Sequence, residues 1–380
     1  MAFLRNDAIN RVNLHYGVQA LAQGAGGVFY LVFLLRAGLS VPVTLLAMAA
    51  ILAGRLFLRP ALVPLAKRWG LKPLLIAGTI GMAVQYPLLA QVRGLDGALA
   101  ALIVVSAVGD VLYWPSFNAY FATVGDAEHR GHQVGAREAL AAVAGVIAPL
   151  LGAAALLTVG PGATFAAVGV VQVLAAIPLL GAPAVPVRAE ASGAFAAAKP
   201  MALFYATDGW FDACWIYVWQ MALFVTLKNN IAAYGGAMAL AGLVGAGCGL
   251  LIGRRIDAGG GRGAVLIAYG LGVGVVILRA ASLGAPWLAV GANAVGALLI
   301  PVLSPTIGGA TYNIIKASPC ALRFQVGSEA GWDVGCLLAC ATAAAILSLG
   351  APLGSAILLA LPGVLAGGAL IWRMYQSAGA

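Results

Sequence analysis

The chain has 380 residues, of which 62% are hydrophobic and only 9% are charged, and its mean hydropathy is +0.99. Soluble proteins carry about a quarter charged residues, so a water-exposed globular surface is excluded and lipid must solvate most of the molecule. The net charge of +9 does not indicate a nucleic-acid partner, because Lys and Arg punctuate the ends of apolar runs instead of clustering.

A helix needs about 20 mainly apolar residues to cross a bilayer. Taken in chain order, the sequence predicts twelve such helices. Short loops rich in Gly, Pro and charge separate them. The predicted spans are residues 14–35, 41–61, 72–92, 97–123, 134–158, 161–183, 201–226, 232–254, 263–283, 286–315, 324–349 and 351–373.

The longest polar interruption follows the sixth predicted span. It predicts an N-terminal six-helix bundle at 1–183, a cytoplasmic linker at 184–200 and a C-terminal six-helix bundle at 201–380. A weak internal repeat agrees, because Gln133-Val134-Gly135 opens the fifth span as Gln325-Val326-Gly327 opens the eleventh. We therefore expect an all-α membrane protein of twelve transmembrane helices in two pseudo-symmetric bundles.

The positive charges indicate an orientation. If the N-terminus is placed inside, 17 of the 21 Lys and Arg residues fall on the inner side and four on the outer side. The positive-inside rule then predicts a plasma-membrane protein, in the inner membrane if bacterial, with both termini cytoplasmic. In this topology Arg279 lies near an outer helix end and reaches toward the interface.

Five acidic residues lie inside the predicted spans: Asp110, Asp208, Asp212, Glu329 and Asp333. Each costs at least about 2.5 kcal/mol at the bilayer centre unless it is hydrated or paired. Asp212 and Asp333 lie about 17 Å and about 14 Å into their spans, near the midplane. No Lys or Arg is expected equally deep, so these side chains should face a polar cavity.

The spacing of these acids favours a proton or cation site. Asp208 and Asp212 share one helix face, as do Glu329 and Asp333, because each pair is four residues apart. Closely spaced, partly desolvated carboxylates bind a proton near neutral pH. We expect Asp212, Asp333, Asp208 and Asp110 to couple transport to protons. The alternative is a set of structural acids bonded to polar neighbours.

Aromatic and amide side chains crowd the fourth and seventh spans beside these acids. Aromatic faces bind apolar rings and cations, or stack on sugars. Ordinary helix packing is the alternative for any one ring. The candidate substrate-binding residues are Tyr113, Trp114, Phe117, Asn118, Trp210, Trp215 and Gln220.

Two motifs carry a resemblance to a known family. The loop after the eighth span, from Gly253 to Arg262, has the pattern G-x-x-x-D-x-x-G-x-R with Asp257 at its centre. The fifth span contains Gly145-Val-Ile-Ala148-Pro149-Leu-Leu-Gly152, which is similar to a pattern of proton antiporters. The chain thus resembles the major facilitator superfamily. Lys67 stands where the first-half loop of that family has Asp, and Ala148 stands where it has Gly.

The resemblance implies transport by alternating access and a cytoplasmic gate. In that family's fold the second span meets the eleventh, the fifth meets the eighth, and spans one, four, seven and ten line the cavity. Complementary charges lie at the ends of the meeting helices. We expect a latch in which Glu138 pairs with Arg254 or Arg255 and Glu329 pairs with Arg55 or Arg59, while Asp257 caps or pairs nearby.

The function expected is secondary active transport of a small organic solute. The acids in the spans indicate proton coupling. The fifth-span pattern favours export, and an acidic, aromatic cavity favours amphipathic or cationic compounds. Proton-coupled uptake of a sugar or similar polar nutrient is the first alternative, and a non-transporting sensor or assembly partner is the second. HExxH, GxSxG and GxxxxGK[ST] do not occur, so we expect no enzyme, cofactor or metal. The expected partners are a small-molecule substrate, protons and the lipid bilayer, and no nucleic acid. We expect the protein to be a monomer.

Overall fold

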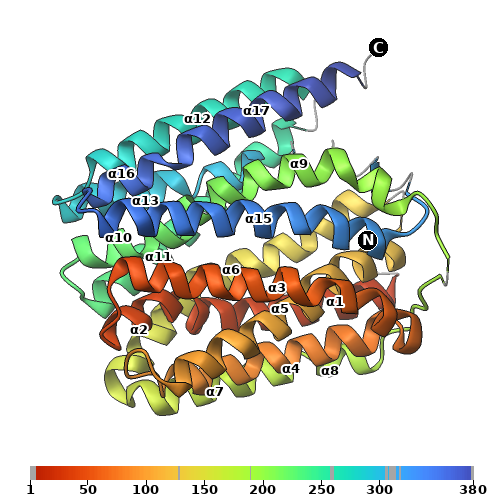
Figure 1. Ribbon diagram of the computed structural model, residues 1–380, viewed down its shortest axis with the longest axis horizontal. Helices are drawn as coiled ribbons and strands as arrows, with labels where there is room; N and C mark the ends of the chain where they lie inside the picture. Colours follow the sequence, from red (N-terminus) through yellow and green to blue (C-terminus); the bar gives the residue numbers. More distant parts are fainter. Residues whose placement is uncertain are drawn as a thin grey trace.

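Long helices lying side by side make up the structure (Figure 1). The computed structural model describes residues 6–126, 129–188, 190–256, 261–303, 307, 314–315 and 318–377. Within these ranges the regular secondary structure is helical throughout. This follows from the composition, because a helix satisfies its own backbone N–H and C=O groups where lipid offers no partner.

The first half contains six spans, and side-chain caps start several of them. Asn6, Ser40 and Asp96 accept hydrogen bonds from backbone N–H groups of the helices that follow. The N–H groups of Leu99 and Arg93 also lower the pKa of Asp96.

The helices of the first half are α1 (Asp7–Ala25), η2 (Gly27–Phe29), α2 (Tyr30–Arg36), α3 (Val41–Trp69), α4 (Leu71–Leu89), α5 (Gly97–Val124), α6 (Arg130–Thr158), α7 (Gly160–Leu174) and α8 (Ile177–Leu180).

The second half has an interrupted first span. There α9 (Ala194–Asp212) continues into η3 (Ala213–Val218), a π-helical segment, and then into α10 (Trp219–Thr226). The remaining helices are α11 (Ile231–Ile256), α12 (Gly261–Ala281), α13 (Pro286–Gly296), α15 (Ala321–Ser348), α16 (Leu353–Leu358) and α17 (Ala360–Ser377).

The predicted twelve-helix fold is confirmed. Ten stretches in the described ranges are long and apolar enough to cross a membrane, and α4 and the continuous α9–η3–α10 rod complete the set. Three boundaries differ from the prediction by seven residues or more, and the first is the start of α1 at Asp7, where residue 14 was expected. Helix α3 continues beyond residue 61 to Trp69, and α9 begins at Ala194, inside the segment expected to be the linker.

The two halves meet along two helix pairs. Helix α3 packs along α15, and α6 packs along α11, as expected for the second with the eleventh span and the fifth with the eighth. The α6–α11 pair approaches at backbone distance: a Cβ added to Gly242 would lie 2.7 Å from the carbonyl carbon of Gly145. Small residues allow the two backbones to approach this closely. In lipid, where no hydrophobic effect drives helices together, such close van der Waals packing holds the pair.

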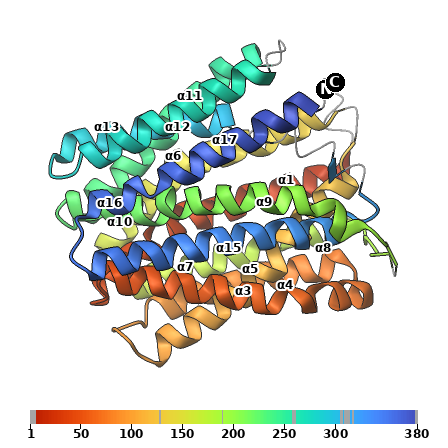
Figure 2. The same ribbon diagram turned by 45° about the horizontal axis from the view of Figure 1, so that its top comes forward.

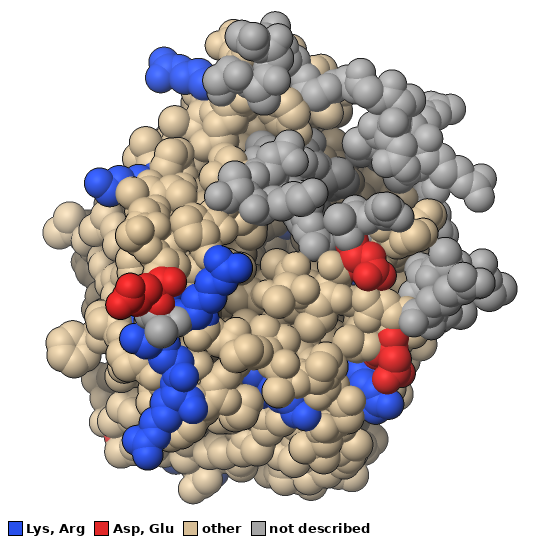
Figure 3. Space-filling model, turned by 90° about the vertical axis from the view of Figure 1, so that its right-hand side faces the viewer, with Lys and Arg blue, Asp and Glu red and all other residues tan. Residues whose placement is uncertain are grey.

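Helix α1 begins and α17 ends at the same end of the bundle, here named the terminal end (Figures 1 and 2). Figure 3 looks at this end and shows Lys and Arg side chains spread over it. Exposed basic residues of the helix ends and the 181–193 segment include Lys67, Arg68, Arg188, Lys199 and Arg373. Such basic residues flanking helix ends favour a cytoplasmic terminal end.

The topology gives a first prediction. Reporter domains fused after Ala380 and inserted at Ser192 should both report the cytoplasm, because the helices near both positions end at the terminal end. A reporter in the α10–α11 loop at Asn229 should report the other compartment. The measurement is paired phosphatase and fluorescent-protein activity, and a non-cytoplasmic signal at either of the first two positions would contradict the topology.

Candidate functional site

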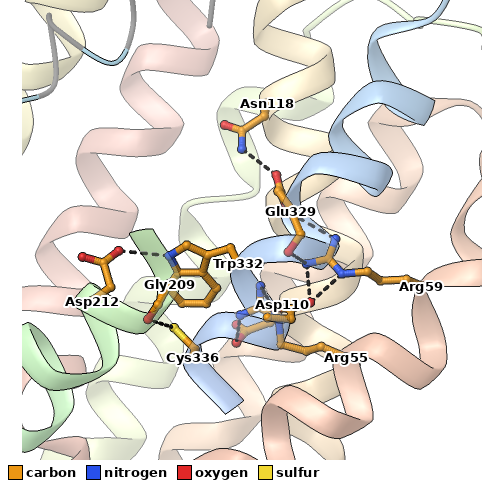
Figure 4. Close-up of polar contacts among 10 residues, drawn as sticks. Arg55, Arg59, Asp110, Asn118, Gly209, Asp212, Glu329, Trp332 and Cys336 are labelled. Carbon is orange, nitrogen blue, oxygen red and sulfur yellow. Dashed lines mark hydrogen bonds and ion pairs between the residues drawn. The ribbon is translucent and has the colours of Figure 1, made fainter. Parts of the chain in front are cut away.

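A buried charge cluster joins the two halves near the middle of the helices (Figure 4). Helix α3 supplies Arg55 and Arg59, one turn apart, and α15 supplies Glu329 and Asp333, also one turn apart. Residues four apart share a helix face. Because α3 packs along α15, the two basic residues face the two acidic ones.

Asp333 is the centre of the cluster, and its side chain is 0% exposed. Its Oδ2 accepts a hydrogen bond from Arg59 Nε at 2.5 Å and forms an ion pair with Arg59 Nη2, also at 2.5 Å. Its Oδ1 lies 2.9 Å from Arg55 Nη2, an ion pair without a well-aligned hydrogen bond. One carboxylate of the second half therefore binds two guanidinium groups of the first half. Charge-assisted contacts between Arg and a carboxylate are among the strongest polar contacts in proteins.

The edges of the cluster involve two further acids. Arg55 Nη1 lies 3.3 Å from Asp110 Oδ2 of α5. Arg59 Nη1 lies 3.5 Å from Glu329 Oε2, and its Nη2 donates to the Glu329 carbonyl oxygen at 3.2 Å. Asn118 of α5 donates to Glu329 Oε1 at 2.9 Å. Three helices, α3, α5 and α15, thus share one polar network, which we call the interhalf network.

The network has unequal charges. Arg55 and Arg59 carry two positive charges, since Arg stays protonated in proteins, whereas Asp110, Glu329 and Asp333 carry up to three negative charges. One proton on one carboxyl group makes the whole network neutral. In a membrane interior, where net charge is costly, this arrangement can bind and release one proton.

The network corrects the expectation that no Lys or Arg lies as deep as Asp333. Arg55 and Arg59 are 5% and 2% exposed and pair directly with it. The expectation was wrong because α3 is longer than its apolar core: it runs to Trp69, so Arg55 sits near its middle instead of at its end. The predicted contact of Glu329 with Arg55 or Arg59 is present as the Arg59 pair.

A second acid pair lies in α9. Asp212 Oδ2 accepts from the indole Nε1 of Trp332 on α15 at 3.0 Å. Asp208, one turn earlier, lines a small cavity with Tyr269 of α12 and Gly363 of α17. The cavity holds about 10 Å³ of free space, which is room for about one water molecule. Trp332 was not among the predicted site residues, and its position beside Asp333 was its only signal.

Most of the predicted aromatic residues are packed inside one half, apart from the network. Tyr113 and Phe117 are buried in the first half, where the Tyr113 hydroxyl pairs with His15 Nε2 at 3.0 Å. Trp114 contacts Tyr113 edge to face at 5.0 Å. In the second half Trp210 donates to the Leu359 carbonyl oxygen at 2.6 Å. Of the predicted binding set, Asn118 is the member that is hydrogen-bonded to the interhalf network among the described residues.

Trp215 and Gln220 belong to the interrupted seventh span. Gln220 is half-buried in α10. Arg279 of α12 lies 3.7 Å from the centre of the Trp215 ring and 4.7 Å from that of Trp219. It also donates to the Trp215 carbonyl oxygen at 2.9 Å. The expectation that Arg279 reaches the interface is wrong, because its guanidinium turns inward onto two indole faces and is 4% exposed.

The second predicted latch is only partly visible. The side chains of Arg254 and Arg255, and Asp257 as a whole, lie outside the described residues. Glu138 is bonded to its neighbour Arg137 at 2.6 Å. Its pairing with the eighth span therefore stays a prediction.

Two helical halves joined by a buried charge network are the arrangement expected of a membrane transporter. The family model of the Major Facilitator Superfamily matches residues 16–319, and the chain belongs to this family. The crystal structure of the nucleoside transporter NupG, in an Asp-to-Ala mutant, is similar with a TM-score of 0.69 and 13% identity, covering 97% of this chain and 100% of that one. No curated protein matches the sequence. The chain is therefore a multi-pass membrane transporter.

The network predicts unequal costs for its acids. Asp333→Asn should lower the free energy of unfolding by about 3–5 kcal/mol, because two buried guanidinium groups lose their shared counter-charge. Asp110→Asn should cost roughly 1 kcal/mol, since that side chain is 21% exposed and makes one long ion pair. Thermal unfolding of the purified variants in detergent measures both, and equal losses would contradict the central role of Asp333.

Proposed function

We propose that the protein is a proton-coupled secondary transporter that moves a small organic solute by alternating access. The observation that carries this proposal is the interhalf network, in which two Arg of the first half face two acids of the second half and Asp110 adds a third carboxylate. A proton on this network changes the electrostatic attraction between the halves, and so biases the equilibrium between their two arrangements.

Asp110 is the carboxyl group best placed to exchange the proton. Its side chain is 21% exposed, compared with 12% for Glu329 and 0% for Asp333. It also makes the longer of the two Arg55 ion pairs. Protonated Asp110 would release part of Arg55 while Asp333 keeps its grip. Asp333 then anchors the halves, and Asp110 is the carboxyl group within the interhalf network that titrates during the cycle.

The terminal side of the network supports a gate. Leu322 and Val326 of α15 pack in one buried apolar cluster with Leu62 of α3 and Phe121 of α5. Glu329 lies between this cluster and Asp333 along α15, held by Arg59 and Asn118. Together they close the seam at the terminal end. Opening toward that end requires Glu329 to leave both partners.

The gate can be tested at Glu329. Glu329→Gln removes the charge that Arg59 pairs with, so molecules open at the terminal end should become several-fold more frequent. The readout is the maleimide labelling rate of Val326→Cys, with and without Glu329→Gln, in a background where the partly exposed Cys320 is Ser. Unchanged labelling would remove Glu329 from the gate.

The geometry favours a polar solute over an amphipathic cation. Three of the aromatic side chains expected to bind a cation have partners within the protein: Tyr113 contacts His15, Trp210 contacts the Leu359 carbonyl oxygen and Trp215 contacts Arg279. These rings therefore do not form an aromatic cage around a cation. The polar groups of the interhalf network are instead acids, Arg and Asn118, with the Trp332 indole beside Arg55. The nucleoside transporter of similar fold is in line with a polar ring as cargo. We therefore favour uptake of a polar nutrient over export.

The solute is found by a thermal-shift screen of the purified protein against nucleosides, sugars and cationic amphipathic compounds. Stabilising compounds then go into proteoliposomes that enclose a pH dye. We expect polar ring compounds to enter together with protons. Protons moving against the solute would instead support export, and stabilisation without flux of any hit would support the sensor alternative.

Asp110→Asn separates proton coupling from solute movement. We expect at least a tenfold loss of accumulation driven by a pH gradient, while exchange of labelled for unlabelled solute persists, because the network can still rearrange but no longer titrates at this position. Asp96→Asn is the matched control, since Asp96 lies outside the spans as a helix cap. Gradient-driven accumulation by Asp110→Asn at the wild-type level would exclude the role of Asp110.

A further inference from the structure

Trp332 touches both acid sites at once. Its indole N–H donates to Asp212 Oδ2 of α9 at 3.0 Å, and its ring centre lies 5.3 Å from the guanidinium carbon of Arg55 on α3. Asp333, the main partner of Arg55, is the next residue on α15. Figure 4 shows the indole between Asp212 on one side and the Arg55 group on the other.

The backbone around Trp332 is fixed by the tight packing of α15 against α9. A Cβ on Gly209 would meet the backbone of Trp332, and one on Gly331 would meet Ala202. The Cys336 thiol donates to the Gly209 carbonyl oxygen at 2.9 Å. Helix α15 is therefore closely packed against α9, and rotation of the indole side chain is a response to a change at Asp212 that leaves this packing intact.

The indole of Trp332 contacts one charged group on each side, the carboxylate of Asp212 on α9 and the guanidinium of Arg55 on α3. A hydrogen bond to an ionised carboxylate is roughly twice as strong as one to a neutral acid. The attraction of a guanidinium to an indole face depends on the orientation of the ring. When Asp212 takes a proton, the hydrogen bond that holds the indole becomes weaker. The ring is then free to turn away from Arg55, whose hold on Asp333 changes in consequence.

We propose that Trp332 couples the charge of Asp212 to the Arg55–Asp333 contact, so that protonation in α9 is transmitted to the interhalf network. The role is one of positioning, and it rests on the proposed function. The titratable groups facing Asp212 are Asp208 on its own helix, Tyr269 on α12 and Cys336 on α15. By linkage, the state of the network must act back on proton binding at Asp212 to the same extent.

The test needs no solute. Spin labels are placed at Lys67→Cys on α3 and Lys199→Cys on α9, both exposed at the terminal end, in a Cys320→Ser background. The distance distribution between the labels is recorded in lipid nanodiscs from pH 5 to pH 9. The variants are Trp332→Phe, which keeps a ring but loses the N–H, Trp332→Leu, which loses both, and Asp212→Asn.

We expect the wild-type distances to change with pH. In Trp332→Phe the midpoint should move to higher pH by about one unit, a tenfold change in proton binding, because the carboxylate has lost a hydrogen bond that favours its charged form. Asp212→Asn should abolish that part of the change and leave Trp332→Phe without further effect. Trp332→Leu should also separate the labels at high pH, since Arg55 has lost its aromatic neighbour.

Trp219→Phe is the matched control. Trp219 also donates from its indole to a buried side chain, Asn293 Oδ1 at 2.9 Å, but it lies away from the network, so its midpoint should equal the wild-type value. A wild-type midpoint in Trp332→Phe, or additive effects of Trp332→Phe and Asp212→Asn, would overturn the proposal. If Trp332→Phe does not fold, Asp212→Glu displaces the acceptor of the same bond and must move the midpoint as well.

The outcomes separate this inference from the proposed function. A pH-dependent distance change that requires Trp332, in a protein that carries no solute, would retain the coupling and reject the transporter proposal. Solute flux with a wild-type pH profile in Trp332→Phe would retain the transporter and reject the coupling.

Discussion

The fully buried carboxylate of Asp333 is the group on which the arrangement of the two halves depends. A lone charge in the membrane interior is costly, and here its counter-charges come from another half of the molecule, through Arg55 and Arg59 of α3. The halves therefore cannot separate at this level without breaking the ion pairs of Asp333 with Arg55 and Arg59. Any opening between α3 and α15 must supply these three charges with other partners.

Helix α15 is held by two kinds of force. On the α9 side, Gly331 and Gly335 bring the backbones so close that a single Cβ would clash, and such packing does not respond to pH. On the α3 and α5 side, charge pairs and the Asn118 bond to Glu329 dominate. Shape fixes α15 within its own half, whereas charge joins it to the other half. Movement between the halves is therefore expected along α3–α15 and not within α9–α15.

The twelve spans could be predicted because a lipid solvent forces long apolar helices, and the pairing of α3 with α15 and α6 with α11 followed from the family resemblance. The ion-pair partners of Asp333 could not be predicted from the sequence. An apolar window ends where charges begin, so it placed Arg55 and Arg59 at a helix end, although α3 continues to Trp69. Trp332 and the His15–Tyr113 pair were equally hidden, because hydrogen-bond partners about 100 residues apart leave no periodic signal.

Two buried arginines show how the choice of partner decides what a charge can do. Arg279 is held by the Trp215 carbonyl and by two indole rings of its own half. None of these groups takes a proton near neutral pH, so that contact is permanent and steadies the π-helical segment η3. Arg55 has an indole neighbour too, in Trp332, but its charge partners are the carboxylates of Asp110 and Asp333. Carboxylates can be neutralised, so under the proposed function the second kind of contact is the one that releases and re-forms during a transport cycle.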